Sequence, residues 1–166
     1  MKFSLALITT CLLAAPALAD VQIRFIESAP KDRFVLINTG CPLQTVDVAI
    51  DLSQSQGGLI FDVTADGAGV EVFQPVQVEG GAVTLAAVTD GDQRLNFQIN
   101  GFATNAEVVI SADLDDVLAN SPLGQIRVAD NELSGTAVQM TIDGQSTSSV
   151  FAPDTDVATV PTGCIS

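Results

Sequence analysis

The chain contains no histidine, tryptophan or tyrosine, and these absences exclude several classes of function. Without histidine there is no imidazole base for a nucleophilic serine or cysteine, and no histidine ligand for zinc or copper. Without tryptophan or tyrosine, a sugar could stack only on the eight phenylalanines, which argues against a glycoside-cleaving site. The glutamates are too scattered to single out an acid–base pair, so we expect no enzymatic activity.

Basic residues are scarce as well. The sequence has six lysines and arginines against 20 aspartates and glutamates, which gives a net charge of −14. Binding to nucleic acid or to an anionic membrane needs clusters of lysine or arginine, and the sequence has none. The charge instead favours a cation or a positively charged partner. Solubility of an exported protein is the simpler explanation of the same acidity.

Long hydrophobic runs are limited to the N-terminus. Lys2 precedes the apolar segment 3–13, and residues 17–19 read Ala-Leu-Ala, which is typical of a cleavage site. This pattern predicts a secretory signal peptide over residues 1–19, too short for a membrane span. We expect residues 20–166 to form one exported domain, periplasmic or extracellular, with no membrane-spanning segment.

Cysteine is rare, and one of the three cysteines, Cys11, falls in the predicted signal peptide. Cys41 and Cys164 remain, and an even number in an oxidising compartment predicts an intramolecular disulfide between them. In the chain-entropy model a loop of this length contributes roughly 4–5 kcal/mol of stability. The two cysteines do not form a Cys-x-x-Cys motif, so we expect a structural role rather than a redox one.

The mature chain does contain a repeated alternation of apolar and polar residues. The alternation has a period of two and is clearest over residues 21–25, 46–52, 95–99, 108–114 and 138–142. Short sequences rich in glycine, aspartate and asparagine separate these segments and predict tight turns. The pattern predicts an all-β fold, a single antiparallel β-sandwich closed by the disulfide, with Ig-like and jelly-roll topologies both compatible. One helical turn is expected over residues 115–120.

Asp113, Asp115 and Asp116 form the densest group of acidic residues. Strand alternation places Asp113 and Asp115 on one side of a strand, which we expect to face solvent, with Asp116 at the strand end. Carboxylates placed in this way can supply the oxygen ligands that Ca²⁺ prefers. A solvated strand end, with Asp115 or Asp116 capping a helical turn, is the simpler alternative.

Two acidic loops are further candidates for a cation site. Residues 62–67 begin like an EF-hand loop, but the twelfth position is Phe73 rather than glutamate, which excludes an EF-hand. Residues 90–92 form a second Asp- and Gly-containing turn. Loops at one end of a sandwich can bring such acids together around a cation. The sequence alone does not decide whether these loops do so.

Short stretches spread over most of the mature chain carry a family resemblance; they are residues 21–27, 29–34, 58–63, 67–75, 88–92 and 113–116. Together they resemble the bacterial exported proteins called aggregation factor core proteins, named after the core protein of the sponge aggregation factor. The resemblance implies a surface or extracellular protein linked to cell aggregation, a process that depends on calcium in the sponge system. It identifies no particular binding residue.

These observations lead to one expected function and two alternatives. We expect a secreted, non-catalytic binding or adhesion protein, with Ca²⁺ as its only cofactor and a protein or a cell surface as its partner. The first alternative is a periplasmic accessory module that binds a protein partner through its sheet edges or loops. The second is a carboxylate-dependent hydrolase.

Overall fold

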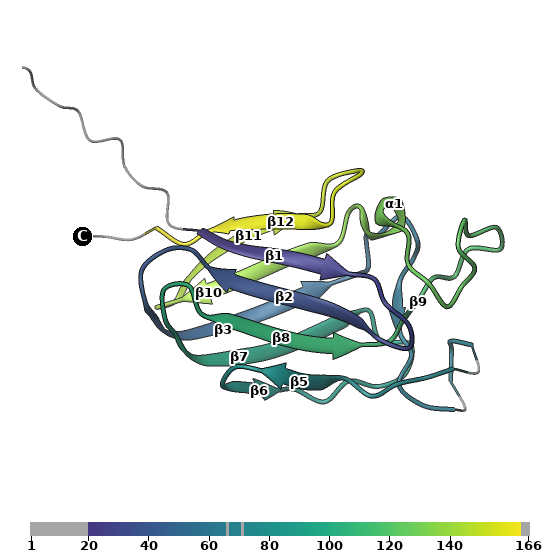
Figure 1. The fold of residues 1–166 in the computed structure, drawn as a ribbon, viewed down its shortest axis with the longest axis horizontal. Helices are drawn as coiled ribbons and strands as arrows, with labels where there is room; N and C mark the ends of the chain where they lie inside the picture. Colours follow the sequence, from purple (N-terminus) through teal and green to yellow (C-terminus); the bar gives the residue numbers. More distant parts are fainter. Residues whose placement is uncertain (1–19, 66, 71, 164–166) are drawn as a thin grey trace, which may run out of the picture.

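Two five-stranded antiparallel sheets pack face to face in the computed structural model, which describes residues 20–163 except 66 and 71 (Figure 1). The order of the first sheet is β12 (Val157–Pro161), β1 (Asp20–Ile26), β2 (Asp32–Asn38), β8 (Glu107–Ala112) and β5 (Gln77–Gly80). The order of the second is β11 (Gln145–Val150), β10 (Ala137–Ile142), β3 (Leu43–Asp51), β7 (Arg94–Phe102) and β6 (Val83–Leu85). The all-β prediction is therefore confirmed, and the two sheets are consistent with a β-sandwich.

The alternating residues of the sequence become the core between the sheets. In β1 the side chains of Val21, Ile23 and Phe25 are buried, whereas the residues between them are exposed. Phe25 packs against Phe34 of the neighbouring β2, with 5.3 Å between the ring centroids. Apolar side chains from both sheets continue this cluster, so burial of apolar area is the main stabilising contribution in this part of the molecule.

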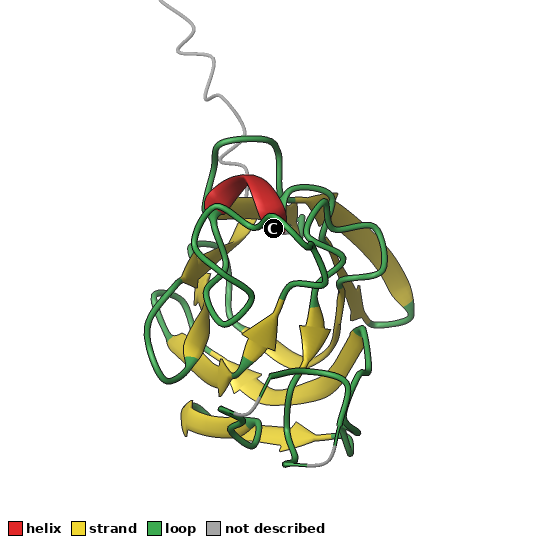
Figure 2. Cartoon of the chain, turned by 90° about the vertical axis from the view of Figure 1, so that its right-hand side faces the viewer, coloured by secondary structure: helices red, strands yellow, loops and turns green. Residues whose placement is uncertain are grey.

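One end of the sandwich is built differently, and we call it the loop end. It consists of a two-stranded ladder, β4 (Ile60–Phe61) with β9 (Leu114–Asp115), the one-turn helix α1 (Asp130–Leu133), and the loops 62–76 and 116–129. These elements lie on the right in Figure 1 and face the viewer in Figure 2.

The structure differs from the predicted strand over 108–114 and from the predicted helical turn over 115–120. The strand β8 ends at Ala112, and the chain then leaves the first sheet to form β9. Residues 116–120 form no helix; instead the Asp116 side chain accepts a hydrogen bond from the Leu118 amide at 2.8 Å. The short helix α1 begins further along, where Glu132 accepts a hydrogen bond from the Ala129 amide at 2.7 Å.

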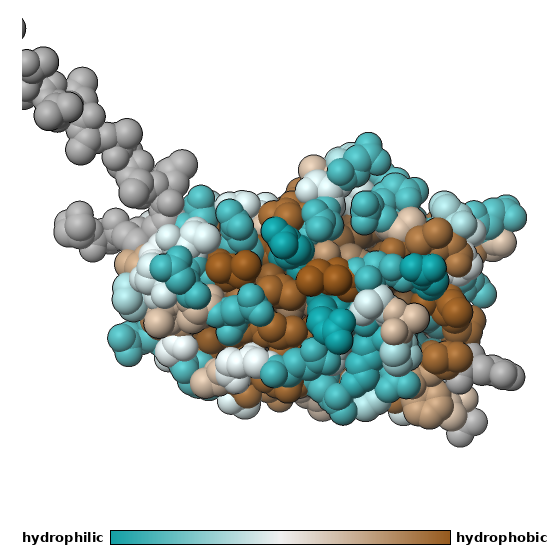
Figure 3. Space-filling model, viewed as in Figure 1, coloured by the Kyte–Doolittle hydropathy of each residue, from teal (hydrophilic) through white to brown (hydrophobic). Residues whose placement is uncertain are grey.

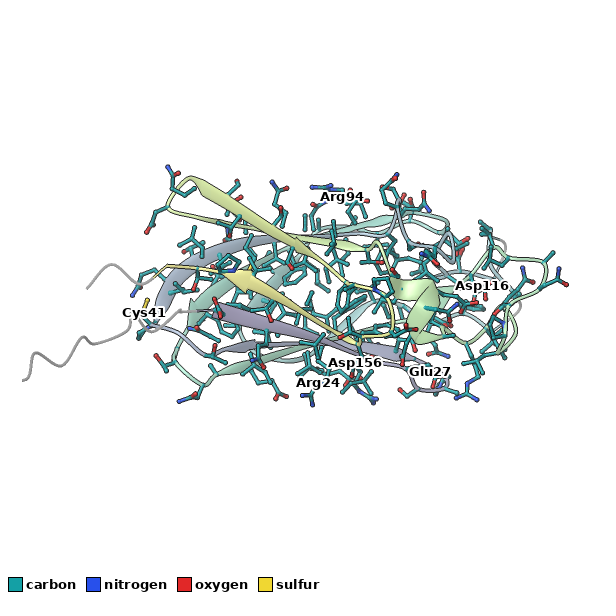
Figure 4. The ribbon with its side chains drawn as sticks, turned by 90° about the horizontal axis from the view of Figure 1, so that it is seen from above. Arg24, Glu27, Cys41, Arg94, Asp116 and Asp156 are labelled. Carbon is teal, nitrogen blue, oxygen red and sulfur yellow. The ribbon has the colours of Figure 1, made fainter. Side chains whose placement is uncertain are left out.

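The opposite end of the sandwich holds Cys41, in the loop between β2 and β3 (Figure 4). Cys164 and the predicted signal peptide 1–19 lie outside the described residues, so both the disulfide and the leader stay predictions. The described backbone brings the relevant segments close, because Asp20 pairs with Pro161 and the Thr39 amide donates to the Asp20 carbonyl at 2.9 Å. No described helix is long and apolar enough to cross a bilayer.

Candidate cation site

The β4–β9 ladder positions the most deeply buried acids of the molecule. Phe61 pairs with Leu114, and both side chains are fully buried in the core, which anchors the ladder. Immediately after β4, the Asp62 amide donates to the Asp113 carbonyl at 3.1 Å. Two segments about fifty residues apart in sequence therefore present their carboxylates at one place.

Asp62 is the central residue of this group. Its side chain is 0% exposed, and neither carboxylate oxygen has a hydrogen-bond partner among the described residues. Asp115 is also buried; its Oδ2 accepts from the Val70 amide at 2.6 Å, whereas its Oδ1 has no partner. A carboxylate buried without partners is costly, so such a pair calls for a compensating positive charge or proton.

Gly69 covers the two carboxylates at close range. A Cβ atom at this position would lie 2.4 Å from Asp62 Oδ2 and 2.5 Å from Asp115 Oδ2. The two oxygens therefore converge on one point, and their separation cannot exceed the sum of these distances. Only glycine lets the backbone approach so closely, which is why the loop covers the carboxylates without displacing them.

Asp90 joins the group from the loop before β7. Its Oδ1 accepts from the amides of Val63 and Thr64 at 2.8 and 3.1 Å, and its Oδ2 accepts from the Ala68 amide. Although burial opposes the effect, these backbone hydrogen bonds hold the pKa of Asp90 below its ordinary value. Asp90 therefore remains charged and fixes the loop that follows Asp62.

The remaining carboxyls of the group hold protons more tightly than usual. Burial raises the pKa of Asp62 to about 7, aided by the negative charges of the neighbouring Asp115 and Asp90. Burial and the neighbouring Asp115 likewise raise the pKa of Asp113 to about 7. The pKa of Asp115 is raised as well, again mainly by burial. Full ionisation of this group is therefore unfavourable unless a cation is bound.

Asp32 extends the acidic group toward the first sheet. It is 4% exposed, and its Oδ1 accepts from the Ser28 amide at 3.1 Å. Burial raises its pKa to about 7, and the charges of Glu27 and Asp113 add to the effect. Asp113 thus lies between Asp32 on one side and the Asp62–Asp115 pair on the other.

The predicted ligands Asp113, Asp115 and Asp116 are buried in the structure and do not face solvent. They are 5%, 1% and 2% exposed, so the expectation of a solvent-facing pair is wrong. The reason is that β9 pairs with β4 and the loop 67–70 covers it. Asp115 faces Asp62, whereas Asp116 lies at the edge of the group and lines a cavity of about 250 Å³.

Sequence reasoning ranked Asp62 and Asp90 behind the 113–116 segment. An aspartate followed by a glycine-containing turn is sufficiently explained by turn formation, so nothing distinguished Asp62 as buried. The informative signal is the presence of acids in three separate segments, at residues 62, 90 and 113–116. Loops at one end of the sandwich do bring these three segments together.

The donor set is compatible with a calcium ion but is not preassembled around one. Asp62 and Asp115 offer carboxylate oxygens, which suit Ca²⁺ and not a soft metal. Among the residues that the structure describes, no three acidic or cysteine side chains already stand in positions that would hold a metal ion. Binding would therefore require side-chain adjustment around the Asp62–Asp115 pair.

Comparison with known proteins adds no information about this site. No family model, curated protein or solved structure matches the chain. The resemblance to aggregation factor core proteins therefore stays an expectation, and the function has to be argued from the geometry described above.

Proposed function

We propose that the protein is an exported, non-catalytic binding protein of the adhesion type, whose loop end is held together by a calcium ion at Asp62 and Asp115. One observation carries this proposal. Asp62 is fully buried, both of its carboxylate oxygens lack a partner among the described residues, and Asp115 converges on it. Asp90 and Asp113 add negative charge beside the pair.

A cation explains this arrangement better than protons alone. Close carboxylates repel one another when ionised, and the group can remain charged near neutral pH only if a positive charge is supplied. The described residues supply none to Asp62. Calcium tolerates irregular oxygen sites with variable numbers of ligands, whereas magnesium demands near-octahedral geometry and retains water. Extracellular calcium modules bind with dissociation constants of about 10⁻⁴–10⁻³ M, which suits an exported protein.

Burial also argues for binding rather than catalysis. A hydrolase of the carboxylate type must bring its acids into contact with the substrate. Asp62 is 0% exposed and does not line the neighbouring cavity that Asp115 and Asp116 line, so a substrate could not reach both acids of the pair without opening the loop end. The predicted Cys41–Cys164 disulfide and the resemblance to aggregation factor core proteins are part of the same proposal, and both favour a location outside the cytoplasm.

The test is thermal unfolding of mature protein (residues 20–166) in millimolar CaCl₂ and in chelator. At ten times its dissociation constant, calcium stabilises the fold by about 1.4 kcal/mol, or roughly 3–6 °C for a domain of this size. Asp62→Asn should abolish this shift, whereas Asp143→Asn, an exposed residue in the β10–β11 turn, should preserve it. A wild-type melting temperature that is the same with calcium and chelator would reject the proposal.

A further inference from the structure

The exposed apolar side chains gather at the loop end. Of the large hydrophobic residues that are exposed in the described part of the chain, six lie in the two loops there; we call them the apolar rim: Val72, Phe73, Val117, Leu118, Leu123 and Ile126. The hydrophobic surface at the right of Figure 3 corresponds to this end of the molecule. Such clustering marks an interaction site more often than a structural one, because scattered exposure is the norm.

Hydrogen bonds anchor the backbone of the loop that carries four of the rim residues. The Val117 amide donates to the Gly57 carbonyl at 3.1 Å, and the Asp116 amide donates to the Gln125 carbonyl at the same distance. Arg127 closes the loop through two hydrogen bonds to Glu27, at 2.6 and 2.8 Å. Val117 nevertheless remains 56% exposed. The exposure is thus built into an anchored loop.

A cavity of about 250 Å³ opens between the two loops that carry the rim. Gly69 and Val70 line it from one loop, and Val117 and Gln125 from the other. Asp115 and Asp116 complete the lining, and each retains one buried carboxylate oxygen with no described partner: Oδ1 of Asp115 and Oδ2 of Asp116. At about 30 Å³ per water molecule, the space can hold the head of a long side chain.

Charge complementarity indicates which kind of partner side chain the cavity would bind. The described cations near this end already have partners: Arg127 pairs with Glu27, and Lys31 donates to Gln77. The mature chain carries 20 acidic residues and, without Lys2, five basic ones. A cavity lined by acidic side chains and bordered by the apolar rim therefore suits a lysine or arginine whose neighbours are apolar.

We propose that the loop end binds a segment of a partner protein in which a lysine or arginine is flanked by bulky apolar residues. The basic side chain enters the cavity toward Asp116, and its apolar neighbours pack on the rim. This inference rests on the proposed binding function and names the chemistry of its partner, but it does not depend on the calcium ion. The carboxylate that defines it is Asp116, not Asp62.

The absence of tryptophan and tyrosine from the chain makes the test direct, because the fluorescence of a tryptophan in a peptide reports binding without background. The probe is the peptide acetyl-Trp-Leu-Lys-Val-Arg-Leu-amide, titrated with mature protein in calcium and in chelator. The control peptide carries glutamate in place of lysine and arginine. We expect saturable binding, at least tenfold tighter for the basic peptide.

Variants then locate the site. Asp116→Asn and the double change Val117→Asp with Ile126→Asp should each weaken peptide binding at least tenfold. The matched control is Val150→Asp, because Val150 is also 56% exposed but lies at the end of β11, outside the two loops that carry the rim. Circular dichroism of each variant verifies that it remains folded, and Val117→Ser replaces the double change if that variant unfolds.

Three results would overturn the inference. They are equal binding of the basic and acidic peptides, equal weakening by Val150→Asp, and stronger association with phosphatidylcholine vesicles than with the peptide. Failure of the calcium site alone has a different signature. The melting temperature would then ignore calcium while the peptide still bound with the same dependence on Asp116.

Discussion

The body of the sandwich and its loop end follow opposite rules of burial. In the body the inward positions are apolar, as in β1, where Val21, Ile23 and Phe25 are buried. All buried acidic side chains of the described residues lie at or beside the loop end; they are Asp32, Asp62, Asp113, Asp115, Asp116 and Glu132. The body is therefore stable in itself, whereas the stability of the loop end depends on what neutralises its carboxylates.

The largest expected effect comes from a change in the body. Phe34→Ala removes a fully buried ring that packs on Phe25, and should lower the free energy of unfolding by about 3–5 kcal/mol. Urea denaturation measures the loss. The increase in melting temperature caused by calcium should be the same as for wild type, because Phe34 is not a proposed calcium ligand. A loss below about 1 kcal/mol would mean that the body is not the stable part.

The pH dependence of stability should reveal the contribution of the buried carboxyls at the loop end. The folded-state pKa values of Asp32, Asp62 and Asp113 are about 7, above the ordinary value of 3.8. Between these two values the folded protein binds protons that the unfolded chain has released, so stability is lost as the pH rises toward and through 7. In chelator, the melting temperature should therefore rise by several degrees when the pH is lowered from 8.5 to 5.5.

Calcium should flatten this pH profile, because the ion replaces the protons. Thermal melts followed by circular dichroism, at four pH values with calcium or chelator, measure both effects. The comparison between body and loop end would break if the melting temperature in chelator increased with pH over this range.

Adding a single methyl group at Gly69 should weaken calcium binding specifically. In Gly69→Ala the new Cβ would lie within 2.5 Å of oxygens of Asp62 and Asp115, so the carboxylates must move apart. We expect at least tenfold weaker calcium binding by calorimetry, equivalent to about 1.4 kcal/mol. Gly80→Ala is the control, because its Cβ would find its nearest atom at 3.8 Å. Equal calcium affinities for the two variants would exclude Asp62 and Asp115 as a joint site.

The smallest effect is expected at the surface of the loop end. Arg127→Gln removes the ion pair with Glu27, whose hydrogen bonds from Arg127 hold the pKa of Glu27 below its usual value. Exposed ion pairs contribute little, so the melting temperature should change by no more than about 2 °C. Thermal melting at low and high salt measures the change. A larger loss would indicate that this pair, rather than the buried group, organises the loop.

The body could be predicted from the sequence because its signal is repeated. The alternation over residues 21–25 falls within β1, and that over 46–52 runs along β3 and one residue past its end at Asp51; Val21, Ile23 and Phe25 of β1 are buried between the sheets. In strands of this kind the local alternation of apolar and polar residues directly determines which side chains are buried and which are exposed. The two-sheet architecture then follows from the number of half-apolar strands.

The loop end could be predicted only in part, because its two strands, β4 and β9, have two residues each and no detectable period. The acids of 113–116 were identified as a group, but their burial depends on the loop 67–70 that covers them. For Asp62 the sequence predicts a turn, since local turn chemistry explains a segment that contains aspartate and glycine without reference to distant residues. Burial of an acid is a tertiary property and leaves no local signature.

The pairing of Asp20 with Pro161 has a practical consequence for handling the protein. It places the beginning of β1 and the end of β12 next to each other, at the end of the sandwich that faces away from β9 and Asp116. A tag, dye or solid support joined to either of these strand ends would leave the loop end pointing into the medium. An immobilised sample would thus display many copies of the same face in one orientation, which suits force measurements and multivalent capture.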